Sequence, residues 1–213
     1  MWKHLAPMLL AAVTLAAPQA RAQEADSGIV DVALVLAVDV SLSMDEEEQQ
    51  AQRAGYIAAL SHPAVLDAIA RGRRGRIALL YMEWGGPWSQ RVVAPWAVID
   101  GPDGARAFAD TIARADLQTS RGTSIAVALD FASGLFLLAP PADRRVIDVS
   151  GDGPNNMGGP VEAARDRTLA RGVEINGLPL MIREPDPLFS VRDLDIYYEE
   201  CVIGGPSAFM IPV

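Results

Sequence analysis

Five oxygen-bearing residues that can bind a metal ion occur at three separate places in the chain. Asp39, Ser41 and Ser43 take alternate positions of one short stretch. Thr123 follows a glycine, and Asp152 lies between two glycines. None of the three places contributes an imidazole or a thiolate, and hard oxygen ligands favour Mg²⁺, with Mn²⁺ or Ca²⁺ as alternatives, over Zn²⁺ or copper.

A magnesium site is compatible with so few protein ligands. Mg²⁺ takes about six oxygens and keeps several of its waters, which leaves a position for an incoming carboxylate. The alternative is helix capping: Ser43 precedes Glu46 by three residues, the spacing of a capping box. Capping accounts for the first place only, so the sequence favours the metal site.

The elements that carry these residues read as alternating strands and helices. Val30 to Val38 and Arg145 to Val149 are apolar runs typical of buried strands, and they are followed by Asp39 and Asp152. Ligands gather beyond the carboxyl ends of parallel strands, so we expect the polar residues to meet there. The expected helices are residues 44–60 (with a continuation at 65–70), 101–115, 124–138, 161–171 and 193–200, and further strands are expected at 173–180 and 208–213.

One strand of the sheet is expected to run antiparallel. Arg76 to Trp84 and Arg91 to Trp96 are joined by a short turn through Gly85-Gly86-Pro87, as in a hairpin. The sequence thus predicts a doubly wound, mainly parallel α/β sheet with one antiparallel edge strand and helices on both faces. Trp84, Trp88 and Trp96 surround the hairpin; packing is the favoured interpretation, and an exposed aromatic patch for a partner is the alternative.

The three motifs together resemble the metal-ion-dependent adhesion site of von Willebrand factor A domains. The resemblance covers nearly the whole chain after residue 22, and extends to a group of exported bacterial proteins with this domain. It implies that Ser41, Ser43 and Thr123 bind the metal through hydroxyls, while Asp39 and Asp152 act mostly through bound water. It also implies that an acidic side chain of a protein partner takes the remaining position on the metal.

The resemblance is incomplete at the carboxyl terminus. The sequence stops at Val213, directly after the last expected strand, where the family usually has a closing helix. We therefore expect either a fragment or a strand with one uncovered apolar face, which would favour association.

Composition and the amino terminus indicate an exported protein. A basic start at Lys3, an apolar stretch from Leu5 to Ala17 and a small-x-small site at 20–22 predict a signal peptide over residues 1–22, followed by one domain over 23–213. No later segment is long and apolar enough to span a membrane. Residues 23–213 hold 16 basic and 27 acidic groups, a net charge of −11, which argues against nucleic acid as the partner. We expect a periplasmic or secreted location, and an inert thiol at the single cysteine, Cys201.

Catalysis is the competing interpretation, and the residues do not favour it. After residue 22 the chain has no lysine, and His62, its one histidine, precedes Pro63 in an expected helix break. A magnesium-dependent phosphatase of the haloacid-dehalogenase type would use Asp39 as the phosphoryl acceptor, but its pattern needs an Asp where Ser41 stands and a later lysine. We therefore interpret the protein as a binding module rather than an enzyme.

Four further polar residues are weaker candidates. Glu83, Asn155 and Asn156 lie near the expected site, and a structural role is favoured for each. Asp148 lies within an apolar strand, where it is expected to accept hydrogen bonds.

Overall fold

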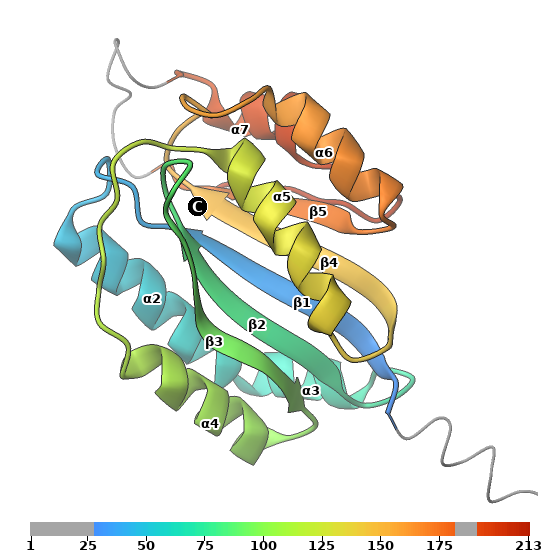
Figure 1. Ribbon diagram of the computed structural model, residues 1–213. Helices are drawn as coiled ribbons and strands as arrows, with labels where there is room; N and C mark the ends of the chain where they lie inside the picture. Colours follow the sequence, from blue (N-terminus) through green and yellow to red (C-terminus); the bar gives the residue numbers. More distant parts are fainter. Residues whose placement is uncertain (1–27, 182–190) are drawn as a thin grey trace, which may run out of the picture.

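The computed structural model describes residues 28–181 and 191–213 and shows a five-stranded sheet between two layers of helices (Figure 1). The strand order is β3-β2-β1-β4-β5, so the first strand lies in the centre. The strands are β1 (Val30–Asp39), β2 (Ile77–Trp84), β3 (Gln90–Ile99), β4 (Ala142–Gly151) and β5 (Glu174–Pro179). The predicted signal peptide lies outside the described residues.

The pairing of the strands confirms the predicted sheet. β1 pairs in parallel with both β2 and β4, β5 pairs in parallel with β4, and only β3 runs antiparallel, next to β2. In this register Asp39 is opposite Trp84, and Val38 is opposite Ser150. The carboxyl ends of β1, β2 and β4 therefore lie level, and the loops that follow them share one edge.

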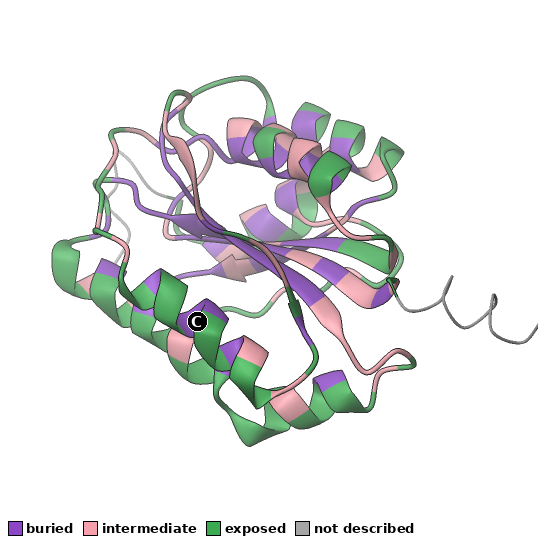
Figure 2. Cartoon of the chain, turned by 60° about the horizontal axis from the view of Figure 1, so that its bottom comes forward, coloured by how far each residue is buried: buried purple, intermediate pink, exposed green. Residues whose placement is uncertain are grey.

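The helices are divided evenly between the two faces of the sheet (Figures 1 and 2). On one face the core includes side chains of three helices, α2 (Glu46–Leu60), α3 (Pro63–Ala70) and α4 (Pro102–Ala113). The other face is covered by α5 (Ile125–Leu135), α6 (Val161–Ala170) and α7 (Leu194–Tyr197), the last of which continues as a π-helical turn, Tyr198–Val202. Within residues 28–181 and 191–213, no helix has the length and apolar character needed to cross a bilayer.

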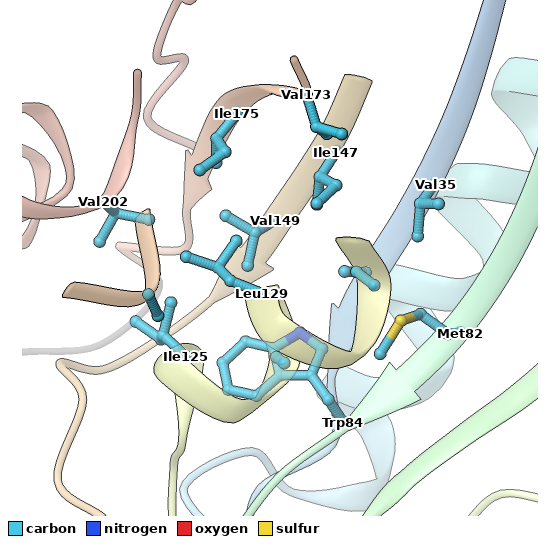
Figure 3. Packing of buried hydrophobic residues seen from close by; sticks show 14 of the residues in the cluster. Val35, Met82, Trp84, Ile125, Leu129, Ile147, Val149, Val173, Ile175 and Val202 are labelled. Atoms are coloured by element: carbon cyan, nitrogen blue, oxygen red, sulfur yellow. The ribbon is translucent and has the colours of Figure 1, made fainter. Parts of the chain in front are cut away.

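Alternate residues of each central strand enter the two cores, which is why those strands are apolar on both faces. Under α5, Val35, Trp84 and Ile147 pack around Leu129 (Figure 3). The neighbouring Leu36 and Tyr81 point to the opposite core, under α2 and α4. Each face buries its own apolar surface, the main favourable term in folding.

Two expected elements differ from the structure. The helix expected over 124–138 ends at Leu135 and is followed by a 3-10 turn, Phe136–Leu138. The segment 208–213, predicted to be a strand, lies along β5 and is hydrogen-bonded to it, from Gly177 N to Phe209 O, from Ile211 N to Gly177 O and from Val213 N to Pro179 O, each at 3.0 Å. It forms one parallel bridge, between Gly177 and Met210, rather than a continuous ladder. Pro179 of β5 has no N–H to donate to the carbonyl of Ile211, which interrupts the ladder beyond this bridge.

Candidate metal centre

Four of the five predicted site residues are joined by consecutive hydrogen bonds at the carboxyl edge of the sheet. Asp39 is fully buried at the end of β1, and its Oδ1 accepts from the backbone N–H of Ser41 at 2.7 Å. The hydroxyls of Ser41 and Ser43 lie 2.8 Å apart, and Ser43 Oγ donates to Asp152 Oδ1 at 2.7 Å. The turn after β1 and the turn after β4 thus bring their oxygens together from residues more than a hundred positions apart.

The capping alternative for Ser43 is wrong. The N-cap of α2 is Asp45, whose side chain accepts from Glu48 N at 2.9 Å, while Glu48 Oε2 accepts from Asp45 N at 2.9 Å. The capping box is therefore complete without either serine. The hydroxyls of Ser41 and Ser43 contact each other and Asp152 at the edge of the sheet instead.

The loop that carries Thr123 is attached to the same edge through its backbone. Ser120 N donates to Val40 O and Leu42 N donates to Ser120 O, both at 2.9 Å, so this loop extends the sheet beside Ser41. Thr123 itself is buried. Among the described residues its hydroxyl makes no hydrogen bond with the other four site residues, so the contacts of its backbone alone fix its place.

Asn155 and Asn156 have the structural roles that were favoured for them. The side-chain Oδ1 of Asn156 accepts from Thr123 N at 2.9 Å, and Asn156 N donates back to Thr123 O at 2.9 Å. Asn155 Oδ1 accepts from Ala126 N, one of the free donors in the first turn of α5, at 3.0 Å. The two amides thereby fix the loop that contains Asp152 to the loop that contains Thr123.

One oxygen of the buried Asp39 carboxylate is not hydrogen-bonded within the described residues. This atom, Oδ2, is also inaccessible to solvent. Burial, assisted by the negative charge of Asp152, raises the pKa of Asp39 to about 8, although hydrogen bonds from Ser41 act in the opposite direction. A divalent cation beside these oxygens would remove both costs, so the donor set and the orphaned oxygen fit a hard cation.

The donors also differ from those typical of Zn²⁺ or copper sites. Across residues 28–181 and 191–213 there is no cluster of three or more His, Cys, Asp or Glu side chains that could hold a metal. The candidate centre instead combines hydroxyls with two carboxylates, a set suited to Mg²⁺ rather than to Zn²⁺.

Tyr198 and Gly151 belong to the centre and were not anticipated from the sequence. Tyr198 is fully buried, and its hydroxyl, like Asp39 Oδ2, has no partner among the described residues. Both oxygens lie 2.9 Å from the point where a Cβ on Gly151 would be. An aromatic residue in a short helix looks like any core residue in the sequence, so only the fold reveals that this one lies beside Asp39.

Glu83 is held in a buried charge cluster, in line with the structural role favoured for it. It is 2 % exposed and contacts Arg53 of α2 through one carboxylate oxygen, while its other oxygen accepts from Arg91 Nη2 of β3 at 2.6 Å. Arg91 also donates to the carbonyl of Asp116, on the approach to the Thr123 loop, at 2.8 Å. The cluster ties α2, β2 and β3 to that approach.

The family of the chain follows from its sequence as a whole. The model of a family described as "Protein of unknown function (DUF1194)" matches residues 29–213, which include every residue of the candidate centre. The chain belongs to the DUF1194 family. A search of curated proteins gave no match.

Solved structures with the same fold include von Willebrand factor A proteins. A von Willebrand factor type A protein from Catenulispora acidiphila aligns with a TM-score of 0.51 and 18 % identity, covering 71 % of the DUF1194 chain and 33 % of that chain. Proximal thread matrix protein 1 from the mussel byssus, with a zinc-occupied MIDAS motif, aligns with a TM-score of 0.55 and 14 % identity, covering 71 % of the DUF1194 chain and 38 % of that chain. The pilus adhesin SpaC from Lactobacillus rhamnosus GG, in its open conformation, aligns with a TM-score of 0.60 and 12 % identity, covering 86 % of the DUF1194 chain and 28 % of that chain.

These alignments identify the fold of this DUF1194 chain as the von Willebrand factor A type, as the sequence motifs suggested. The DUF1194 chain spans only about a third of the length of these solved chains. At such low identity the likeness concerns the fold.

Proposed function

We propose that this DUF1194 protein holds one divalent cation, Mg²⁺ before Mn²⁺ or Ca²⁺, and uses it to bind an acidic group on a partner protein. The observation that carries the proposal is the run of hydrogen bonds that joins Asp39, through Ser41 and Ser43, to Asp152, together with Asp39 Oδ2, which is buried and has no hydrogen-bond partner among the described residues.

Each residue has a distinct part in the proposed site. The hydroxyls of Ser41, Ser43 and Thr123 would be direct ligands, and Asp39 and Asp152 would supply negative charge, mostly through bound water. The bound cation would offer a positive centre with an open position for a carboxylate. The loops that carry these residues all lie at the carboxyl edge of the sheet. The open position of the cation would therefore face the solvent beyond that edge.

The relatives in fold support this proposal. One of them is described with a zinc-occupied MIDAS motif and another is a pilus adhesin. A binding role also agrees with the scarcity of catalytic groups. His62 caps α3, because its Nδ1 accepts a hydrogen bond from Ala64 N. It lies after the end of α2, whereas Asp39 precedes the start of that helix. We propose a periplasmic or secreted location, as the amino-terminal sequence predicts.

A peptide-display selection in the presence of Mg²⁺, followed by elution with a chelator, tests the function. Selected peptides are expected to share an Asp or Glu, to bind the intact protein only with Mg²⁺, and to fail to bind Asp39→Ala. Binding that persists in chelator would contradict the proposal. Hydrolysis of a phosphate ester that is lost in Asp39→Ala would favour the phosphatase alternative.

A further inference from the structure

A second recess lies next to the candidate metal centre. This recess has a volume of about 220 Å³, and its walls come from the end of β1, the β2–β3 hairpin and the segment before α5. We call it the hairpin pocket; it is lined by Val40, Glu83, Trp88, Ser89, Gln90, Arg91, Gln118, Thr119 and Ser120. Val40 precedes Ser41 in the chain, and Ser120 forms a parallel bridge with Ser41, so the pocket adjoins the proposed ligands directly.

Trp88 at the rim of the pocket is not a packing residue. It is 97 % exposed, whereas Trp84 is fully buried and Trp96 packs against Phe136 with ring centroids 5.5 Å apart. Packing, the interpretation favoured from the sequence, therefore holds for two of the three tryptophans and is wrong for Trp88. A fully solvated indole contributes nothing to the core, and tryptophan is the residue type most enriched at binding hot spots.

The turn that presents Trp88 is fixed rather than loose. Gly85 N donates to Ser89 O and Ser89 N donates to Gly86 O, both at 3.0 Å. Gly85 O accepts from Ser124 N at 2.8 Å, and this contact joins the turn to the start of α5 (Figure 1). The indole is thus held at a set position relative to the Thr123 loop, which lowers the entropy cost of using it in binding.

Arg91 and Glu83, the charged residues in the lining of the pocket, belong to a cluster that also includes Arg53 and carries a net positive charge. The carboxylate of Glu83 is shared between Arg53 and Arg91, so two guanidinium groups face one carboxylate. Arg91 remains a third exposed in its side chain, and in the described part of the chain its buried Nε has no acceptor. The two arginines and one glutamate leave a net positive charge, which favours the entry of an anionic group into the pocket. Arginine forms strong, two-point hydrogen bonds with a carboxylate.

We propose that the hairpin pocket binds a second acidic residue of the partner, a few positions from the residue that reaches the metal, with Trp88 covering the intervening peptide. This inference rests on the proposed function, because it places the first acid on the cation. The partner is thereby narrowed to an acidic peptide segment with two carboxylates in close succession.

Short glycine-based peptides that carry one Asp, with Glu, Gln, Arg or Leu placed one to three residues away, test the proposal by titration in Mg²⁺. Glu at one spacing is expected to bind about tenfold more tightly than the uncharged isostere Gln at the same spacing, and Arg more weakly than either. Arg91→Gln should remove the preference for Glu over Gln, and Trp88→Ala should reduce the affinity of both of these peptides to that of the peptide with Asp alone, which should still bind both variants. Trp88→Ala alone decides the matter if Arg91→Gln does not fold, because the exposed indole can be removed without loss of core.

Leu137→Ala is the matched control, since Leu137 is 90 % exposed and follows the far end of α5 from the metal centre. It should leave every affinity unchanged. Mg²⁺-dependent binding of the Asp peptide without any gain from Glu would overturn the pocket's role and leave the proposed function intact. Loss of all binding in Mg²⁺ would count against both. Tighter, Trp88-dependent binding of glucuronate than of any peptide would assign the pocket to a sugar and overturn the proposal.

Discussion

At the residue scale, the candidate centre is built from side chains that the fold constrains to different degrees. Asp39 is fully buried and accepts a hydrogen bond from the backbone of Ser41, whereas Ser43 is exposed and its hydroxyl contacts the side chains of Ser41 and Asp152. The predicted ligands therefore share a dependence on Asp39, whose removal should be felt by all of them.

Substitution of either carboxylate should abolish metal binding. Asp39→Ala and Asp152→Ala are each expected to remove the heat of Mg²⁺ binding in titration calorimetry, because each takes away one of the two negative charges of the site. Asp45→Ala is the matched control: it removes a nearby carboxylate that caps α2. It should cost about 1 kcal/mol of stability and leave Mg²⁺ binding intact. Equal loss of binding in all three variants would contradict the assignment.

The pH dependence of the metal-free protein should report the buried carboxylate. The pKa of Asp39 is raised from an ordinary value to about 8, so between about pH 4 and pH 8 the folded state keeps a proton that the unfolded state releases. The contribution of this group to the free energy of unfolding is therefore greatest below about pH 4 and is lost as the pH rises through about 8. Urea unfolding in chelator should show this decline, and Asp39→Asn should flatten it. An identical decline in the variant would exclude Asp39 as its source.

Gly151 should matter more than its neighbouring glycine. A Cβ at position 151 would lie 2.9 Å from both Asp39 Oδ2 and the Tyr198 hydroxyl, whereas a Cβ on Gly153 meets nothing within 4 Å. Gly151→Ala is expected to displace the carboxylate, to weaken Mg²⁺ binding and to cost about 1–3 kcal/mol. Gly153→Ala should leave both calorimetry and urea unfolding unchanged, and equal effects of the two substitutions would contradict this geometry.

At the element scale, the parts of the structure that were predictable from the sequence are those with strong local patterns. The apolar runs of β1 and β4, and the helices after them, were recognisable, and the polar residues after each strand pointed to the shared edge. The strand predicted over 208–213 lies beside β5 as a hydrogen-bonded segment but not as a continuous ladder, because Pro179 of the neighbouring strand lacks a donor, which the pattern of the segment itself does not show. Tyr198, Trp88 and the Arg53–Glu83–Arg91 cluster depend on tertiary contacts, which local patterns do not encode.

That charge cluster should be the strongest electrostatic support of the site. Glu83→Ala leaves Arg53, which is largely buried, without its counter-charge, and is expected to cost about 3–5 kcal/mol in urea unfolding. Asp110 forms a pair with Arg114 at 3.3 Å on the surface of α4, where both side chains are more than half exposed. Asp110→Ala should cost about 0.5 kcal/mol or less. Similar costs for the two substitutions would show that the buried cluster is not a special support.

At the scale of the whole molecule, the fold concentrates function at one edge of the sheet. The loops of the candidate metal centre and the hairpin pocket are separate in sequence but lie next to one another because β1, β2 and β4 end level. The rest of the chain buries two apolar cores that hold this edge in place. In the proposed function, a partner would meet one continuous surface in which the cation and Trp88 are neighbours.

The most direct test is a crystal structure of the protein soaked in Mn²⁺, with the ion located by its anomalous scattering. We expect one strong peak among Asp39, Ser41, Ser43, Thr123 and Asp152, absent from crystals of Asp39→Ala. A peak elsewhere, or none at a concentration that saturates the solution titration, would contradict the account.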